Sequence, residues 1–107
     1  MKVLFISPHF PAEMQRFTRG LAEVGAQVYG VSDVPPGQLP AQVREQLHDY
    51  LQVPSLLDED DATRRIVEAA RRIAPDRVEC LWEPCVVLAA RVREALGVSG
   101  MGPQAAI

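Results

Sequence analysis

Short apolar runs alternate along the chain with segments in which apolar residues recur every three or four positions. The runs KVLFIS (residues 2–7), QVYGV (27–31), DYLQV (49–53) and VECLW (78–82) predict four β-strands. The first run is continuous rather than alternating, which is typical of a strand covered by helices on both faces. A fifth short strand or extended segment is expected at residues 98–101.

Helical spacing fills the intervals between these runs. Residues 14–24 predict one amphipathic helix, which Gly25 ends, and a short helix is expected after Pro40. A third helix starts at the acidic residues 58–61 and reaches Ile73, and a fourth follows Pro84 and ends at Gly97. The expected buried stripes are Met14, Phe17, Leu21 and Val24; Val43 and Leu47; Ala62, Ile66, Ala69, Ala70 and Ile73; and Cys85, Leu88, Ala89, Val92 and Leu96.

The alternation of strands and helices predicts the α/β class, with βαβ units and a parallel sheet. We expect a Rossmann-like three-layer sandwich with four to five strands. The length of 107 residues suits a single small domain with a core of its own.

Charge and composition limit the partners. The net charge of −3 argues weakly against a nucleic acid or an anionic membrane as partner, because both reward a clustered positive surface. We therefore expect neither. No run approaches the roughly 20 apolar residues that span a bilayer. Cys80 and Cys85 fit neither a disulfide framework nor a Cys-x-x-Cys metal site. We therefore expect a cytoplasmic protein with two reduced thiols.

Candidate chemistry lies where ligands bind in open parallel sheets, at the carboxyl ends of the strands. His9 and Phe10 follow the first predicted strand, Asp33 follows the second and Glu83 follows the fourth. Glu83 could bind an amine or a backbone N–H, His9 could contact a substrate or be solvated, and Asp33 could cap a turn. No residue is assigned a catalytic or metal-binding role.

Several other readings of the same region are excluded or weak. The first corner lacks the glycine-rich G-x-G-x-x-G sequence of dinucleotide folds, and no P-loop is present. The acidic pair and the aspartate of a response regulator are absent from the corresponding corners. We interpret Trp82 as a core residue, and Cys80 and Cys85 as small buried hydrophobic residues.

Three segments together resemble the N-terminal domain of ATP-grasp enzymes. They are KVLFISPHFPAEMQRFTRGLAEVGAQVYGVSD, DYLQV and ECLWEPCVVLAARVREALGVSGMG. The most specific feature is the last: a strand that ends in Glu83, an alanine-rich helix, and then ALGVSGMGP, which is similar to the segment that leads into the ATP-binding domains. The likeness is strongest to ligases that join a carboxylate to an amine.

The resemblance implies a substrate-side domain at residues 1–100 and the start of a linker at residues 101–107. It implies that the full-length enzyme uses ATP and Mg²⁺ to activate a carboxylate as an acyl phosphate, which an amine then attacks. The implied partners are downstream ATP-grasp domains and a small carboxylate or amino-acid substrate, and a homo-oligomer stays open. Glu83 is implied as a substrate contact, the corner of His9 and Phe10 matches by position, and Asp33 is a weaker match. This fragment alone would hold no cofactor and would not complete the reaction.

Two alternatives remain. The lysine-apolar-serine-proline start is similar to the N-terminal half of two-domain (GT-B) glycosyltransferases, although those usually have a glycine pair where this chain has only Gly20. The chain could also be a stand-alone Rossmann-like interaction module.

Overall fold

A four-stranded parallel sheet forms the centre of the computed structural model, which describes residues 1–98. The strands are β1 (Lys2–Ile6), β2 (Gln27–Ser32), β3 (Leu47–Gln52) and β4 (Arg77–Glu79), in the spatial order β3-β2-β1-β4. All three neighbouring pairs run parallel. The predicted α/β class and parallel sheet are therefore confirmed. The predicted strand at 98–101 falls, apart from Val98, outside the described residues.

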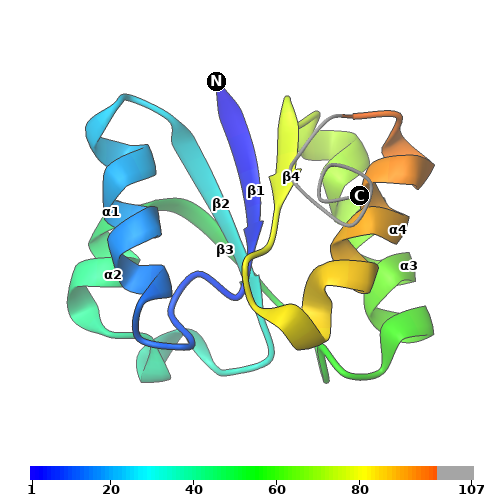
Figure 1. Ribbon diagram of the computed structural model, residues 1–107, viewed down its shortest axis with the longest axis horizontal. Coiled ribbons are helices and arrows are strands. Elements are labelled where there is room, and N and C mark those ends of the chain that lie inside the picture. The colour runs from blue at the N-terminus through cyan, green and yellow to red at the C-terminus, as the bar shows by residue number, and fades with distance from the viewer. Residues whose placement is uncertain (99–107) are drawn as a thin grey trace.

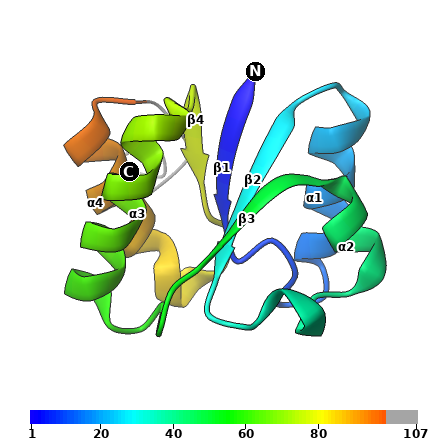
Figure 2. The same cartoon turned by 180° about the vertical axis from the view of Figure 1, so that it is seen from behind.

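Helices cover both faces of this sheet (Figures 1 and 2). Helices α1 (Met14–Glu23) and α2 (Ala41–Gln46) lie on one face, and α3 (Glu59–Ile73) and α4 (Val86–Leu96) lie on the other. Short 3₁₀ turns occur at Pro36–Gln38 and Glu83–Cys85. The arrangement is the three-layer sandwich that the alternation of elements predicts. Within residues 1–98 no helix is long and apolar enough to cross a bilayer.

The larger part of the core lies between the sheet and the α3–α4 layer. Its fully buried members include Leu4 and Ile6 of β1, Ile66 of α3, and Leu88 and Val92 of α4. The stripes predicted for the third and fourth helices face this core, with Ile73 and Leu96 at its margin. A smaller cluster on the opposite face consists of Phe5, Met14 and Val28.

The stripe predicted for the first helix is wrong at two positions. Phe17 is 50% exposed and Val24 is 81% exposed, whereas Thr18 is buried. The buried residues of α1 are Met14 and Thr18, and Leu21 is partly buried beside them. The Thr18 hydroxyl donates a hydrogen bond to the carbonyl oxygen of Pro8 at 2.7 Å, so Thr18 takes the buried place that the apolar pattern assigned to Phe17.

Helix ends follow the signals in the sequence. Asp58 caps α3 by accepting a hydrogen bond from the backbone N–H of Asp61, and acidic residues fill the first turn. Gly97 ends α4 in the left-handed conformation, with φ of 68°. The prediction of both boundaries is confirmed.

Two strands differ in extent from the prediction. Strand β3 begins at Leu47, so Leu47 belongs to the strand and not to the preceding short helix. Strand β4 ends at Glu79, because its pairing with β1 covers only the register from Val3–Arg77 to Phe5–Glu79. Residues 80–82 thus leave the sheet and form part of the rim at its carboxyl edge.

Candidate functional site

The first corner, residues 7–11, is shaped by backbone contacts rather than by glycine. Ser7 adopts φ of 58°, and its N–H donates to the carbonyl oxygen of Val31 at 2.7 Å. The Ser7 hydroxyl donates to the carbonyl oxygen of Phe10, and the Phe10–Pro11 peptide is cis. The N–H of Met14 donates to the carbonyl oxygen of Pro11 at 2.9 Å, which leads the chain into α1.

Helix α1 holds this corner from the side. Thr18 binds the carbonyl oxygen of Pro8, and the Gln15 amide donates to the carbonyl oxygen of His9 at 3.3 Å. Pro8 is itself buried against β2, where a Cβ added to Gly30 would lie 3.0 Å from its Cγ. Pro8 thus packs the corner against β2, and side chains of α1 donate hydrogen bonds to its carbonyl oxygens. His9 and Phe10 lie at the tip of the corner.

His9 and Asp33 are brought together at the ends of β1 and β2. Burial lowers the pKa of His9, and the negative charge of Asp33 partly opposes this by raising it. The buried Nδ1 of His9 has no hydrogen-bond partner among residues 1–98. Asp33 is exposed and accepts a hydrogen bond from the N–H of Leu56 at 3.1 Å. The corner therefore places a partly buried imidazole near the Asp33 carboxyl group.

Tyr50 joins this group from β3, although nothing in the apolar pattern singles it out beyond its place near the strand end. Its hydroxyl donates to the carbonyl oxygen of Val34 at 2.6 Å. Burial raises the pKa of Tyr50, hydrogen bonds with Ser32 and Val34 oppose the rise, and the charge of Asp33 adds to it. The charge of Asp33 therefore acts both on His9, which follows β1, and on Tyr50 of β3.

The Phe10 ring connects the first corner to the end of β4. It packs edge-on against Trp82, with ring centroids 5.4 Å apart and an interplanar angle of 89°. Trp82, expected in the core, is only partly buried and packs against the margin of the core. Glu83 follows it as the exposed first residue of the 3₁₀ turn. Phe10 therefore contacts the residue that directly precedes Glu83 in the sequence.

The segments that follow β1, β2 and β4 lie at one edge of the molecule, the lower edge in Figure 1, and the four predicted site residues belong to these segments. The edge offers two exposed carboxylates, a partly exposed imidazole and a partly exposed aromatic pair. Such a set can bind a small polar ligand through an amine or hydroxyl group and one apolar face. Among residues 1–98 no three His, Cys, Asp or Glu side chains are grouped so that they could hold a metal ion.

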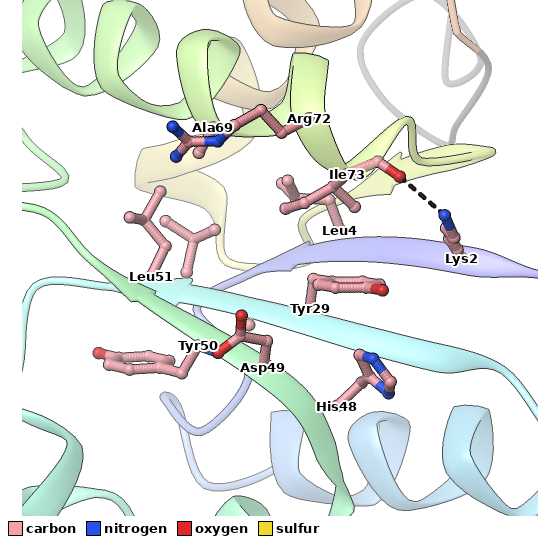
Figure 3. Close-up of a pocket in the computed structure, with 12 residues that line it drawn as sticks. Lys2, Leu4, Tyr29, His48, Asp49, Tyr50, Leu51, Ala69, Arg72 and Ile73 are labelled. Carbon is pink, nitrogen blue, oxygen red and sulfur yellow. Dashed lines mark hydrogen bonds between the residues drawn. The ribbon is translucent and has the colours of Figure 1, made fainter.

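A groove of about 440 Å³ lies elsewhere, over β2 and β3 beside α3 (Figure 3). Its floor includes Tyr29 and Leu51, and its far side includes Ala69 and Ile73 of α3. Lys2 donates a hydrogen bond to the carbonyl oxygen of Ile73 at 3.0 Å, so its charge is partly engaged. The sequence pattern did not predict this groove, because it forms where α3 leaves the edge of the sheet uncovered.

No protein-family model and no curated protein matches this chain.

Proposed function

We propose that the chain is the substrate-side domain of an ATP-grasp ligase that joins a carboxylate to an amine. The edge formed by the first corner, Asp33 and residues 80–85 is its part of the substrate site. We place the protein in the cytoplasm, where ATP and small metabolites are both at hand. The proposal rests on the resemblance of the sequence and on the position of these residues at the carboxyl edge of a parallel sheet.

The observation that carries the proposal is the joining of three separate chain segments at one edge. The charge of Asp33 acts on His9, which links the ends of β1 and β2. The contact of Phe10 with Trp82 links the end of β1 to the end of β4. Ligand sites in open parallel sheets are built in this way, from loops that follow different strands.

The exposed carboxylates define the expected ligand chemistry. Glu83 lies at the start of its turn and can accept hydrogen bonds from a substrate ammonium group, and Asp33 can add a second negative charge. His9 is partly exposed, and its imidazole ring can add a hydrogen-bonding group to this edge. This edge therefore suits the amine end of an amino acid better than a phosphate group.

ATP and Mg²⁺ are assigned to domains other than this one. The described residues offer no group of three ligands for a metal ion, and the corner after β1 turns without the glycines that a phosphate loop uses. The resemblance implies that the downstream ATP-grasp domains hold both cofactors. The share of the residues described here is to bind and orient the substrate.

Trp82 provides a direct test, because it is the only tryptophan and lies at the proposed site. Titration with panels of amino acids and small carboxylates should change its fluorescence in a saturable way for at least one amine-bearing ligand. Glu83→Ala should weaken that binding at least tenfold, which corresponds to about 1.4 kcal/mol. Glu94→Ala, an exposed change near the end of α4, should leave it unchanged. Equal affinities in both variants would remove Glu83 from the site.

The ligase activity needs a separate test on the product of the complete reading frame. ADP release should require both a carboxylate and an amine, and Glu83→Ala should lower turnover or raise the Michaelis constant for the substrate while ATP affinity is kept. An open reading frame without an ATP-grasp region, or ADP release that is indifferent to Glu83, would refute the proposal.

A further inference from the structure

The groove of about 440 Å³ over β2 and β3 lies away from the edge proposed for the ligase substrate (Figure 3). Its lining includes Lys2, the first residue of β1, and the last two residues of α3, Arg72 and Ile73. Lys2 Nζ donates to the carbonyl oxygen of Ile73 at 3.0 Å, which joins the start of β1 to the end of α3. The groove therefore lies toward the amino ends of the strands, whereas the proposed substrate edge lies at their carboxyl ends.

Largely apolar side chains form the floor and the far wall of this groove. Tyr29 and Leu51 on the sheet side and Ile73 on the helix side are all half-buried. The Tyr29 ring lies beside the His48 ring, with centroids 5.0 Å apart and planes inclined at 56°. Figure 3 shows the Tyr29 ring on the sheet side of the groove and Ile73 on the α3 side. A planar apolar group between them would cover the exposed parts of both side chains.

The two cations of the groove favour an anionic ligand. Arg72 is exposed, and neither Arg72 nor Lys2 forms an ion pair within residues 1–98. Lys2 uses one N–H group on the carbonyl oxygen of Ile73, and its ammonium group has further N–H groups that can bind a ligand. The Arg72 guanidinium is a planar fork that matches the two oxygen atoms of a carboxylate.

Asp49 is the single carboxylate among the described residues that line the groove. Its Oδ1 accepts a hydrogen bond from the N–H of Tyr50 at 2.8 Å, and its side chain is exposed. Figure 3 shows Asp49 on the sheet side, across the groove from Arg72 on α3. A carboxylate accepts further hydrogen bonds but repels a second carboxylate. A ligand that fits both sides of the groove therefore carries an acid group beside Arg72 and an uncharged donor beside Asp49.

We propose that this groove binds a small aromatic acid with a ring hydroxyl group, such as a hydroxybenzoate. Its carboxylate binds the Arg72 guanidinium, with Lys2 as a second positive charge. Its ring packs between Tyr29 and Ile73, and its hydroxyl group donates a hydrogen bond to Asp49. The ligand carries no amine, so this site is separate from the edge proposed for the ligase substrate. The inference stands whether or not the ligase proposal is correct.

The size and charge of the groove favour this ligand over related compounds. Ligand pockets typically occupy about 300–1,000 Å³, and a groove of about 440 Å³ suits a molecule of one or two rings. A protonated aromatic amine would bring its positive charge next to Arg72 and Lys2. A saturated ring acid would keep the charge contact but lose the contact of two flat rings with Tyr29. Both compounds therefore serve as controls.

The test is an amide NMR titration of the isotope-labelled chain of 107 residues at constant pH and ionic strength. The probes are para-hydroxybenzoate, benzoate, cyclohexanecarboxylate and benzylamine. We expect para-hydroxybenzoate to move the amide signals of residues 29–31, 48–51 and 69–73 in a saturable way. Benzoate and cyclohexanecarboxylate should bind more weakly, in that order, and benzylamine should leave these signals unchanged.

Arg72→Gln and Arg71→Gln form a matched pair of variants. Both arginines are exposed in the last turn of α3, so both changes remove a favourable interaction with the helix dipole, but only Arg72 lines the groove. Arg72→Gln should weaken the binding of para-hydroxybenzoate about tenfold, the range of a hydrogen bond between charged groups, and Arg71→Gln should leave it unchanged. Asp49→Asn should reduce the preference for para-hydroxybenzoate over benzoate.

Three results would overturn the proposal. The first is the absence of saturable shifts at these residues with either aromatic acid. The second is an equal loss of affinity in Arg71→Gln and Arg72→Gln, which would indicate attraction by net charge alone. The third is equal affinity for para-hydroxybenzoate and benzoate in the wild-type chain, since the hydroxyl group would then have no partner in the groove.

Discussion

Phe10 and Trp82 pack edge-to-face, with ring centroids 5.4 Å apart, and this contact joins the corner after β1 to the turn after β4. The two residues are far apart in the sequence, and Phe10 is 53% exposed. Because Trp82 is the only tryptophan, its fluorescence emission reports on this contact.

Phe10→Ala should change the intensity and shift the emission maximum of Trp82 to longer wavelength, because the ring that shields the indole is removed. The loss of free energy of unfolding should be about 1 kcal/mol, the range of an aromatic pair. The measurement is steady-state fluorescence with urea denaturation. Phe17→Ala serves as a control, since Phe17 is also half-exposed but lies on α1. If both variants change Trp82 emission alike, the contact does not define the rim in solution.

Gly30→Ala and Gly20→Ala should change stability in opposite directions. A Cβ at Gly30 would lie 2.9 Å from Leu47 Cδ1 and 3.0 Å from Pro8 Cγ, so the change forces strand β2 and the first corner apart. We expect a loss of about 1–3 kcal/mol. At Gly20, inside α1, no atom lies within 4 Å, and alanine should stabilise the helix by about 0.5–1 kcal/mol.

Urea denaturation measures both effects. The unfolding free energy should depend on urea concentration with the same slope in the two glycine variants, so that the midpoints can be compared. A neutral Gly30→Ala would mean that the contact of Pro8 with β2 is looser than the structure shows.

The apolar pattern predicted the fold well where burial alone decides the structure. The runs at residues 2–7 and 27–31 became β1 and β2, and the predicted faces of α3 and α4 are buried. It failed at Phe17 and Val24, which are exposed, whereas Thr18 is buried and its hydroxyl donates to the Pro8 carbonyl oxygen. Polar contacts of this kind leave no trace in hydrophobic periodicity.

The site was predictable only as positions on an edge. Parallel topology brings His9, Asp33 and Glu83 to the same rim, and this could be inferred from the strand ends. The contact of Phe10 with Trp82 depends on the path of short turns, which sequence spacing does not specify. The interpretation of both cysteines as small buried residues is confirmed.

Thr18→Val should lower stability by about 1–3 kcal/mol, although it keeps the shape of the side chain. The change removes the donor at 2.7 Å and leaves the Pro8 carbonyl oxygen unpaired in a buried place. Thr63→Val is the matched control, because the Thr63 hydroxyl donates to the carbonyl oxygen of Glu59 on a half-exposed helix face. That variant should stay within about 0.5 kcal/mol of the wild type. Urea denaturation separates the two, and similar losses would argue against a special role for Thr18.

The pH dependence of stability should carry a contribution from His9. Its pKa in the folded chain is below the ordinary value of 6.5, so the unfolded chain binds the proton more readily. Stability from this group is therefore complete above about pH 6.5 and decreases as the pH falls from there towards the folded pKa. His9→Asn should flatten this part of the curve, and urea denaturation at a series of pH values measures it. An unchanged slope would show that His9 is not buried in solution.

Asp33→Asn should lower the pKa of His9 further, because it removes the negative charge that opposes the effect of burial. NMR titration of the His9 ring protons measures this shift. Glu94→Gln, on the exposed last turns of α4, should leave the pKa of His9 where it is. A rise of the His9 pKa in Asp33→Asn, or no change, would mean that the two side chains do not face each other.

The central claim is that the edge at the carboxyl ends of the strands binds substrate, and NMR of the labelled chain tests it most directly. On titration with the amine-bearing ligand that changes Trp82 fluorescence, we predict that amide shifts move at residues 7–11, 32–34 and 80–85. Glu83→Ala should reduce them, and the residues that line the groove over β2 and β3 should stay still. Shifts centred on Tyr29, Leu51 and Ile73, with no change at residues 7–11, 32–34 and 80–85, would contradict the account.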